Sequence, residues 1–217
     1  MDKLFFNDAL ARIAGMTAGL AGICLLGGCL GGPKLQTPKF DAPAAATAAM
    51  QLHDANKDGQ IGRWELKDCP GLREAVPDAD TNGDGALSEE EIIARIETYA
   101  EVQLALIPFE CRFFVNKRPL KGATVRLVPL EFLEGMIRPA DGVTDDSGLV
   151  APAVDDPVAK AEGVTGVNAG FYRIKVSLVD SDGKETISAK YNSETTLGCD
   201  VGHTFHRGVT RFDLASR

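Results

Sequence analysis

Hydrophobic residues follow a helical spacing over 88–107, just before the middle of the chain. The acidic turn "SEEE" opens this segment, with Ser88 suited to the N-cap and the acids suited to the positive helix end. Pro108 ends the helix. The apolar positions that define the helical face are 92, 93, 96, 99, 102 and 106.

Two further segments before position 88 also indicate helix. The alanine-rich stretch 44–53 can be helical, and the stretch after Glu65 is interrupted by Pro70 and Gly71. This interruption predicts two short helical pieces in place of one long helix.

From Phe109 onward the pattern changes to short runs of β-branched and aromatic residues, such as "FECRFFV", "GATVRLVPL" and "GFYRIKVSLVD". The segments "NKRP", "DDSG" and "DSDG" separate these runs as turns. In the third run, Tyr172, Ile174, Val176 and Leu178 alternate with polar residues, which indicates a half-buried strand. Several short strands with regular turns favour a sandwich.

The first 28 residues predict a secretory signal, because an apolar run from about residue 13 to 26 follows two early basic residues. The run is short and glycine-rich for a membrane-spanning helix of about 20 residues. Its end, "LGGC" at 26–29, resembles the bacterial lipobox, which implies cleavage before Cys29 and a lipid on its thiol. An uncleaved anchor or a plain secretory signal is the alternative interpretation. The Pro- and Gly-rich segment 29–44 predicts a flexible tether.

Two twelve-residue segments, 54–65 ("DANKDGQIGRWE") and 80–91 ("DTNGDGALSEEE"), repeat one pattern. Each has acids or amides at its first, third and fifth places, glycine at the sixth, an apolar residue at the eighth and glutamate at the twelfth. Ca²⁺ prefers about six to eight oxygen ligands, and this spacing supplies them around one sharp turn. The alternative interpretation is an acidic turn that binds no metal. Two segments that both match the full pattern, each with its apolar residue at the eighth place, weigh against it.

The two segments resemble the EF-hand family at every ligand position. A frame starting at Asp78 is excluded, because it puts Gly85 where the paired loops need an apolar residue. The resemblance implies two calcium ions. The ligands of the first are Asp54, Asn56, Asp58, the Gln60 carbonyl and Glu65, with a water at Gly62; those of the second are Asp80, Asn82, Asp84, the Ala86 carbonyl, Ser88 (directly or through water) and Glu91.

Calcium is expected to be structural, because sensor proteins often expose a Met-rich groove. Only Met50 and Met136 lie beyond the signal region. The loops start at 54 and 80, a short separation that is similar to that of dockerins, which bind cohesin domains. Dockerin loops usually end in Asp, whereas these end in Glu. A dockerin-like adaptor for a partner protein therefore remains the alternative function.

Five motifs after residue 108 occur in an order that resembles the transthyretin-like or carboxypeptidase-regulatory-like β-sandwich of bacterial lipoproteins. They are "RPLKGATVRLVP", "DGVTDDSGLV", "GFYRIKV", "ISAKYNSETTLGCDV" and "GVTRFDL". The family implies a fold more than an activity. Transthyretin relatives that hydrolyse 5-hydroxyisourate end in "YRGS", whereas this chain ends in "FDLASR". The protein is therefore expected not to be an enzyme; a hydrolase using His203 and His206 is the minor alternative.

The remaining composition limits partners and cross-links. The net charge of -8, without a basic stripe, argues against nucleic acid as a partner. After the signal and the lipidated cysteine, Cys69, Cys111 and Cys199 remain, so at most one internal disulfide forms. That disulfide could join Cys111 to Cys199 or Cys69 to Cys111, and the sequence does not choose between them.

The predicted fold class is multi-domain, α plus all-β: a small helical EF-hand pair followed by a Greek-key β-sandwich of about seven strands. The expected domains are a lipoprotein signal peptide at 1–28, a flexible tether at 29–44, the EF-hand pair at 45–107 and the transthyretin-like sandwich at 108–217. The expected function is a calcium-binding protein of the bacterial cell envelope. Its lipid on Cys29 anchors it to the extracytoplasmic side of a membrane, and a protein or a carbohydrate is its possible ligand.

Overall fold

The computed structural model describes residues 34–202 and 209–215. The chain is mixed α and β, with several antiparallel sheets and few helices. Contacts within Pro33–Arg217 join the helices and the sheets into one compact unit. The signal at 1–28, the lipidation site Cys29 and the pair His203 and His206 lie outside the described residues.

Four helices precede the main sheets: α1 (Ala42–His53), α2 (Arg63–Leu66), α3 (Pro70–Ala79) and α4 (Glu89–Glu101). The expected two short helical pieces are present, but the break lies at 67–69: Pro70 starts α3, and Gly71 lies inside that helix. Ser88 caps α4 as predicted, because its hydroxyl accepts from the Glu91 amide while the Glu91 carboxylate accepts from the Ser88 amide.

Two helix boundaries differ from the prediction. Helix α4 ends at Glu101 and does not reach 107, since Gln103 adopts a positive φ of 52° that breaks the helical path. Ile107 then pairs in a β-bridge with Val167. At the other end, α1 begins at Ala42, inside the expected tether 29–44, with Asp41 as its N-cap. Just before it, the Phe40 ring packs 5.9 Å from the Tyr99 ring.

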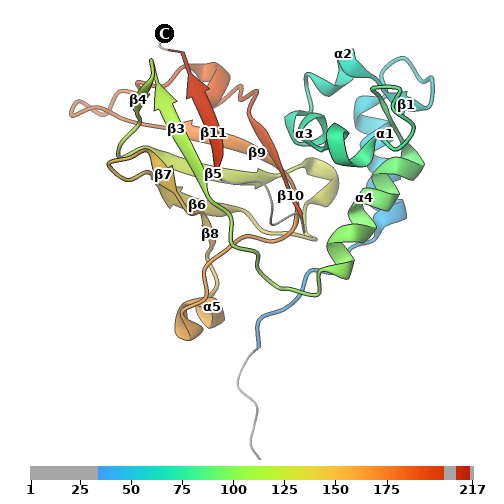
Figure 1. The fold of residues 1–217 in the computed structure, drawn as a ribbon, viewed down its shortest axis with the longest axis horizontal. Helices are drawn as coiled ribbons and strands as arrows, with labels where there is room; N and C mark the ends of the chain where they lie inside the picture. Colours follow the sequence, from blue (N-terminus) through green and yellow to red (C-terminus); the bar gives the residue numbers. More distant parts are fainter. Residues whose placement is uncertain (1–33, 203–208, 216–217) are drawn as a thin grey trace, which may run out of the picture. The chain divides into compact units, whose positions relative to one another are not determined.

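The strands form a short ribbon and two larger sheets (Figure 1). Strands β1 (Gln60–Ile61) and β2 (Leu87–Ser88) make the ribbon. The five-stranded sheet has the order β10 (Gly198–Val201), β9 (Gly170–Ser177), β5 (Thr124–Pro129), β6 (Ala140–Val143), β8 (Ala153–Val154), and all its pairs are antiparallel. The four-stranded sheet has β3 (Cys111–Val115) at its centre, antiparallel to β4 (Arg118–Pro119) and β7 (Leu149–Val150) and parallel to β11 (Thr210–Leu214). The connections contain α5 (Pro157–Glu162), η1 (Glu131–Leu133) and η2 (Ala189–Tyr191).

The apolar residues that alternate along the strands face the protein interior, as expected. Leu127 and Ile174 face each other across β5 and β9, and both are fully buried. From the second sheet, Leu214 is buried and Phe212 is half-buried, stacked on Phe113 with ring centroids 5.0 Å apart. Side chains of both sheets and of the helices belong to one hydrophobic cluster.

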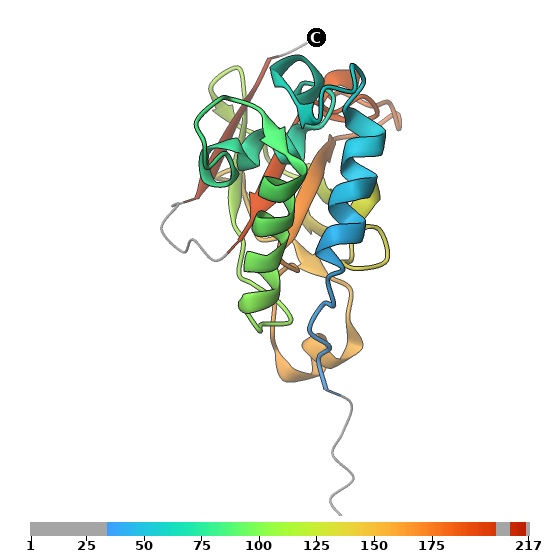
Figure 2. The same cartoon turned by 90° about the vertical axis from the view of Figure 1, so that its right-hand side faces the viewer.

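Helix α3 approaches the five-stranded sheet at backbone distance. A Cβ on Gly198 would lie 2.4 Å from the Pro70 carbonyl carbon, and a Cβ on Gly71 would lie 3.1 Å from the Tyr172 amide nitrogen. A side chain at Gly198 would collide with the backbone, and one at Gly71 would fit only if its neighbours shifted by a few tenths of an ångström. Figure 2 shows the helices lying over β9 and β10 in the same region. The helical part therefore rests directly on the sheet.

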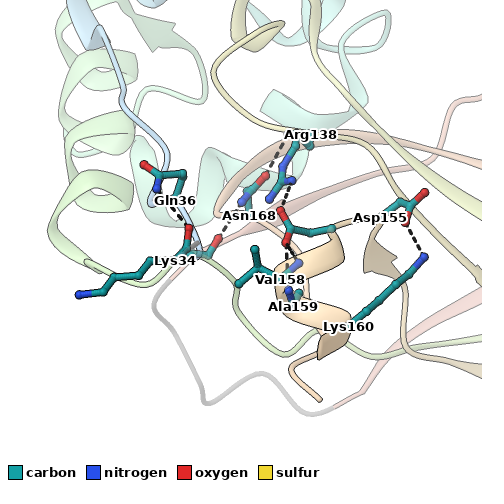
Figure 3. Close-up of polar contacts among 10 residues, drawn as sticks. Lys34, Gln36, Arg138, Asp155, Val158, Ala159, Lys160 and Asn168 are labelled. Atoms are coloured by element: carbon teal, nitrogen blue, oxygen red, sulfur yellow. Dashed lines mark hydrogen bonds and ion pairs between the residues drawn. The ribbon is translucent and has the colours of Figure 1, made fainter. Parts of the chain in front are cut away.

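The connection from α4 to β3 is also held in place (Figure 3). Asn168, which is 2% exposed, donates from its side-chain amide to the Ala105 carbonyl at 2.7 Å and accepts from the Arg138 amide at 2.9 Å. Arg138 also pairs with Asp156 at 2.6 Å, and Asp156 caps α5. One buried amide thus joins the segment after α4 to two loops of the sheet.

Cys69, Cys111 and Cys199 are all buried free thiols, so neither open pairing is formed in the described chain. Burial raises the pKa of Cys69 and of Cys111 to about 12, and these thiols are therefore protonated at neutral pH. Within residues 34–202 and 209–215, no helix is long and apolar enough to cross a membrane.

Candidate calcium-binding site

The two twelve-residue loops, called the first loop (54–65) and the second loop (80–91), lie side by side. Ile61 of β1 pairs with Leu87 of β2, and Gln60 pairs with Ser88. Ile61 and Leu87 are the apolar eighth residues of their loops, and both are fully buried. The side chain of Gln60 also donates to Asp84 of the second loop at 3.0 Å. The structure therefore joins the loops at the position that the sequence pattern specifies.

In the first loop, the side chains at the first, third and fifth places turn inward. The Asp54 carboxylate accepts from the amides of Asp58 at 3.2 Å and Gly59 at 3.1 Å. The same Asp58 amide lies 3.0 Å from the Asn56 side-chain oxygen, and Asp58 in turn accepts from the Gln60 amide. The turn depends on Gly59, whose φ is 88°. Oxygens of three alternate residues are thus gathered around one turn.

Glu65, the twelfth residue, folds back across the start of the first loop. Its Oε1 accepts from the amides of Ala55 at 2.7 Å and Asn56 at 3.2 Å. Its Oε2 accepts from the Gly62 amide at 2.8 Å. Both carboxylate oxygens therefore point into the loop, which is the orientation that bidentate ligation requires.

The second loop repeats this arrangement. Asp80 accepts from the amides of Gly83 at 2.7 Å and Gly85 at 2.9 Å. The Asn82 side-chain oxygen accepts from the Asp84 amide at 2.8 Å, and Asp84 accepts from the Ala86 amide at 2.9 Å. Gly83 and Gly85 both have positive φ values, of 77° and 81°. Equivalent residues thus have equivalent roles in the two loops.

Glu91 is more enclosed than its counterpart Glu65, with only 6% of its surface exposed. Its Oε1 accepts from the amide and the hydroxyl of Thr81, each at 2.9 Å, and its Oε2 accepts from the amide and the hydroxyl of Ser88, each at 3.0 Å. Burial alone would raise the pKa of Glu91, but these hydrogen bonds outweigh burial and lower the pKa to about 2. The carboxylate is therefore ionised at every physiological pH.

The donor chemistry of both loops suits a hard cation, because every predicted ligand is an oxygen. In the part of the chain that the structure describes, no three His, Cys, Asp or Glu side chains converge closely enough to hold an ion. The carboxylates accept from loop amides, so ion binding would exchange some of these hydrogen bonds for ion–oxygen contacts. In this arrangement the oxygens of both loops accept hydrogen bonds from the loop backbone and do not close on a common centre.

A polar cluster that the sequence pattern did not indicate joins the second loop to the sheet. Arg95 of α4 donates from Nε at 2.9 Å and from Nη2 at 2.6 Å to one carboxylate oxygen of Asp200 on β10. The Tyr99 hydroxyl donates to the other oxygen at 2.6 Å. Arg95 also lies 3.7 Å from Asp78, just before the second loop. No local sequence pattern relates residues so far apart in the chain. The one available signal was a charged residue, Arg95, among the apolar positions of the predicted helix.

Trp64, next to Glu65 in the first loop, is 81% exposed. Among the described residues it is the one exposed aromatic side chain, and it belongs to α2. The part of the two larger sheets that the structure describes therefore presents no exposed aromatic strip of the kind that stacks on sugars.

Comparisons with protein-family models, with curated proteins and with solved structures found no match for this chain. Its function is therefore inferred from its own residues and their geometry.

Proposed function

We propose that residues 42–101 form an EF-hand pair that binds two calcium ions. The observation that carries this proposal is the antiparallel pairing of Ile61 with Leu87. This pairing joins two loops whose first residues accept hydrogen bonds in the same way. In each loop the twelfth-place carboxylate turns both oxygens inward. The ligands are those expected from the sequence, from Asp54 to Glu65 and from Asp80 to Glu91.

Calcium has a structural role in this proposal. A sensor must move its helices apart when the ion binds. Here α3 contacts the sheet at backbone distance through Gly71 and Gly198, and α4 is tied to β10 through Arg95 and Asp200. These contacts favour ions that hold the loops and helices in one arrangement.

The sheets after residue 108 act as a binding or structural module, arranged as a Greek-key β-sandwich of the transthyretin-like kind. The protein is not an enzyme in this proposal. Cleavage before Cys29 and lipidation of its thiol would anchor the chain to the outer side of a bacterial membrane. The segment from Cys29 to α1 would then connect the lipid to the folded part.

Calorimetric titration of the calcium-free chain from residue 34 onward tests the two sites. We expect two ions per chain, with Glu65→Gln and Glu91→Gln each removing one of them. Glu90→Gln is the matched control, because it removes the same charge one residue from Glu91 at an exposed side chain. Absence of binding by the unmodified chain, or two ions still bound by the double variant, would contradict the proposal.

A dockerin-like adaptor is the second candidate, favoured by the exposure of Leu52 (57%) and Trp64 (81%) on the helical part. An adaptor would hold its partner protein only when calcium is bound. Trp64→Ala would then release the partner without changing the calcium stoichiometry. Equal capture with and without chelator would exclude this function.

A further inference from the structure

Helices cover only one end of the outer face of the five-stranded sheet. On β9, Phe171 lies under them and is fully buried, with its ring 5.3 Å from Tyr99 and 6.0 Å from Phe132. Side chains alternate along a strand, so Arg173 and Lys175 point to the same face as Phe171. Both are only half-buried, and they lie at the edge of the helical part, where Nη2 of Arg173 donates to the Asp68 carbonyl at 3.3 Å.

The uncovered end of this face is the floor of a cavity of about 620 Å³. Its walls are the α2–α3 connection at 67–68, the segment from η1 to β6 at 131–139 and the loop at 193–196. Cavities of roughly 300–1,000 Å³ are typical of small-molecule sites. Three separate parts of the chain thus line a space, open to solvent on one side, that is large enough for a sugar-sized ligand.

Three cations lie on the floor of this cavity. Lys175 is directly opposite Arg126 across β9 and β5, and Arg173 lies two residues further along the same face. Like charges directly opposite each other destabilise a sheet. The walls carry the acids Asp68, Glu131, Glu134 and Glu194 beside Lys67, so the positive charge is confined to the floor and the lining as a whole is balanced.

The fold neutralises these cations only in part. Arg126 lies 3.6 Å from Asp141, and Arg173 lies 3.3 Å from Glu131. The Nε atom of Arg173 is buried without a hydrogen-bond partner. For Lys175, the described residues provide neither an ion pair nor a hydrogen bond. Arg173 also donates from Nη2 to the Asp68 carbonyl at 3.3 Å. Lys175 is therefore the donor on the floor that remains available to a ligand.

We propose that this cavity, called here the basic cavity, binds a sugar that carries a carboxylate or phosphate group. The anionic group would lie on Lys175 between Arg126 and Arg173. The rim supplies the opposite chemistry, because Glu134 and Glu194 can accept hydrogen bonds from sugar hydroxyls while Ser193 can donate or accept. A cationic floor with an oxygen-rich rim fits a polyhydroxylated anion better than an apolar molecule.

Calorimetry on the calcium-loaded full chain tests this site with glucuronate, glucose 6-phosphate, inorganic phosphate and glucose as probes. We expect one molecule of either sugar anion to bind per chain, and glucose to bind at least tenfold more weakly. Affinity should fall as salt is raised, since the contacts are ionic. Glucuronate and glucose 6-phosphate distinguish a carboxylate from a phosphate as the preferred group.

Lys175→Glu should weaken binding of the sugar anions more than tenfold and also raise the melting temperature. The new carboxylate would face Arg126, which replaces a repulsive pair by an attractive one. Lys184→Glu is the matched control, because Lys184 is an exposed lysine outside the cavity, and it should leave binding unchanged. A variant that binds the sugar anions more weakly but has a higher melting temperature has lost the binding site and not the fold.

Three results would overturn the proposal. Failure of both sugar anions to bind would exclude the site itself. Binding of inorganic phosphate as tight as that of glucose 6-phosphate would exclude recognition of the sugar. Equal binding of the sugar anions by Lys175→Glu and by the unmodified chain would place any observed binding outside the basic cavity.

Discussion

Replacing Arg95 by methionine should strongly destabilise the protein, because it leaves the Asp200 carboxylate buried without its cation. The Asp200 side chain is 2% exposed and that of Arg95 is 10% exposed. Arg95 supplies two of the three hydrogen bonds that the carboxylate receives, and Tyr99 supplies the third. Breaking a buried ion pair by removing one partner typically costs about 3–5 kcal/mol. Asp78, at 3.7 Å from Arg95, cannot replace the lost charge because it is itself an acid.

The effect should also depend on pH. Burial raises the pKa of Asp200, whereas Arg95 and the Tyr99 hydroxyl oppose that effect. Without Arg95 the pKa of folded Asp200 rises further above its unfolded value. A group of this kind stabilises the fold at low pH and loses that contribution as pH rises through its folded pKa. The difference in unfolding free energy between Arg95→Met and the unmodified chain should therefore be larger at pH 7 than at pH 5.

Urea unfolding in saturating calcium measures this difference. The double variant Arg95→Met with Asp200→Asn should lose less stability than the sum of the single variants, because no unpaired buried charge remains. Arg73→Met is the control. Arg73 pairs with Glu74 at 3.0 Å, but the side chains are 40% and 48% exposed, so the loss should stay within about 1 kcal/mol. Equal losses for Arg95→Met and Arg73→Met, or strictly additive losses in the double variant, would refute the reasoning.

Three further outcomes are expected. Gly198→Ala should cost about 1–3 kcal/mol in urea unfolding, because its Cβ would meet the Pro70 carbonyl carbon at 2.4 Å. In calcium-free protein, the low pKa of Glu91 contributes stability that is complete above its ordinary value of 4.5 and is lost as pH falls toward about 2. At 1.36 kcal/mol per pKa unit this is about 3 kcal/mol, and acid titrations of Glu91→Gln should lack it. Calcium should change the fluorescence of Trp64, the single tryptophan, and Glu65→Gln should remove the change that Glu91→Gln retains.

Local patterns in the sequence predicted the local structure well. The cap at Ser88 and the helix break just before Pro70 both depend on residues within one helical turn. The loop spacing likewise predicted that the eighth residues of the two loops, Ile61 and Leu87, pair with each other. Calcium itself stays a prediction.

Long-range packing determined what the sequence did not indicate. Helix α4 ends six residues before the predicted limit, since Gln103 adopts a positive φ, and Ile107 then forms a β-bridge with Val167, 60 residues further along the chain. Asp200 lies 105 residues from Arg95, so no local pattern relates them. The basic cavity exists only because β5 and β9 place Arg126 opposite Lys175, a register that follows from the folded sheet.

Thermal unfolding of the chain from residue 34 onward, with and without a calcium chelator, tests the claim that calcium holds this fold together. At a calcium concentration about 100 times the dissociation constant, each independent site contributes about 2.7 kcal/mol. For two sites in a unit of this size, chelation should lower the melting temperature by about 10–20 °C. The double variant of Glu65 and Glu91 to Gln should show no such decrease. A melting temperature of the unmodified chain that is the same in calcium and in chelator would contradict a structural role for calcium.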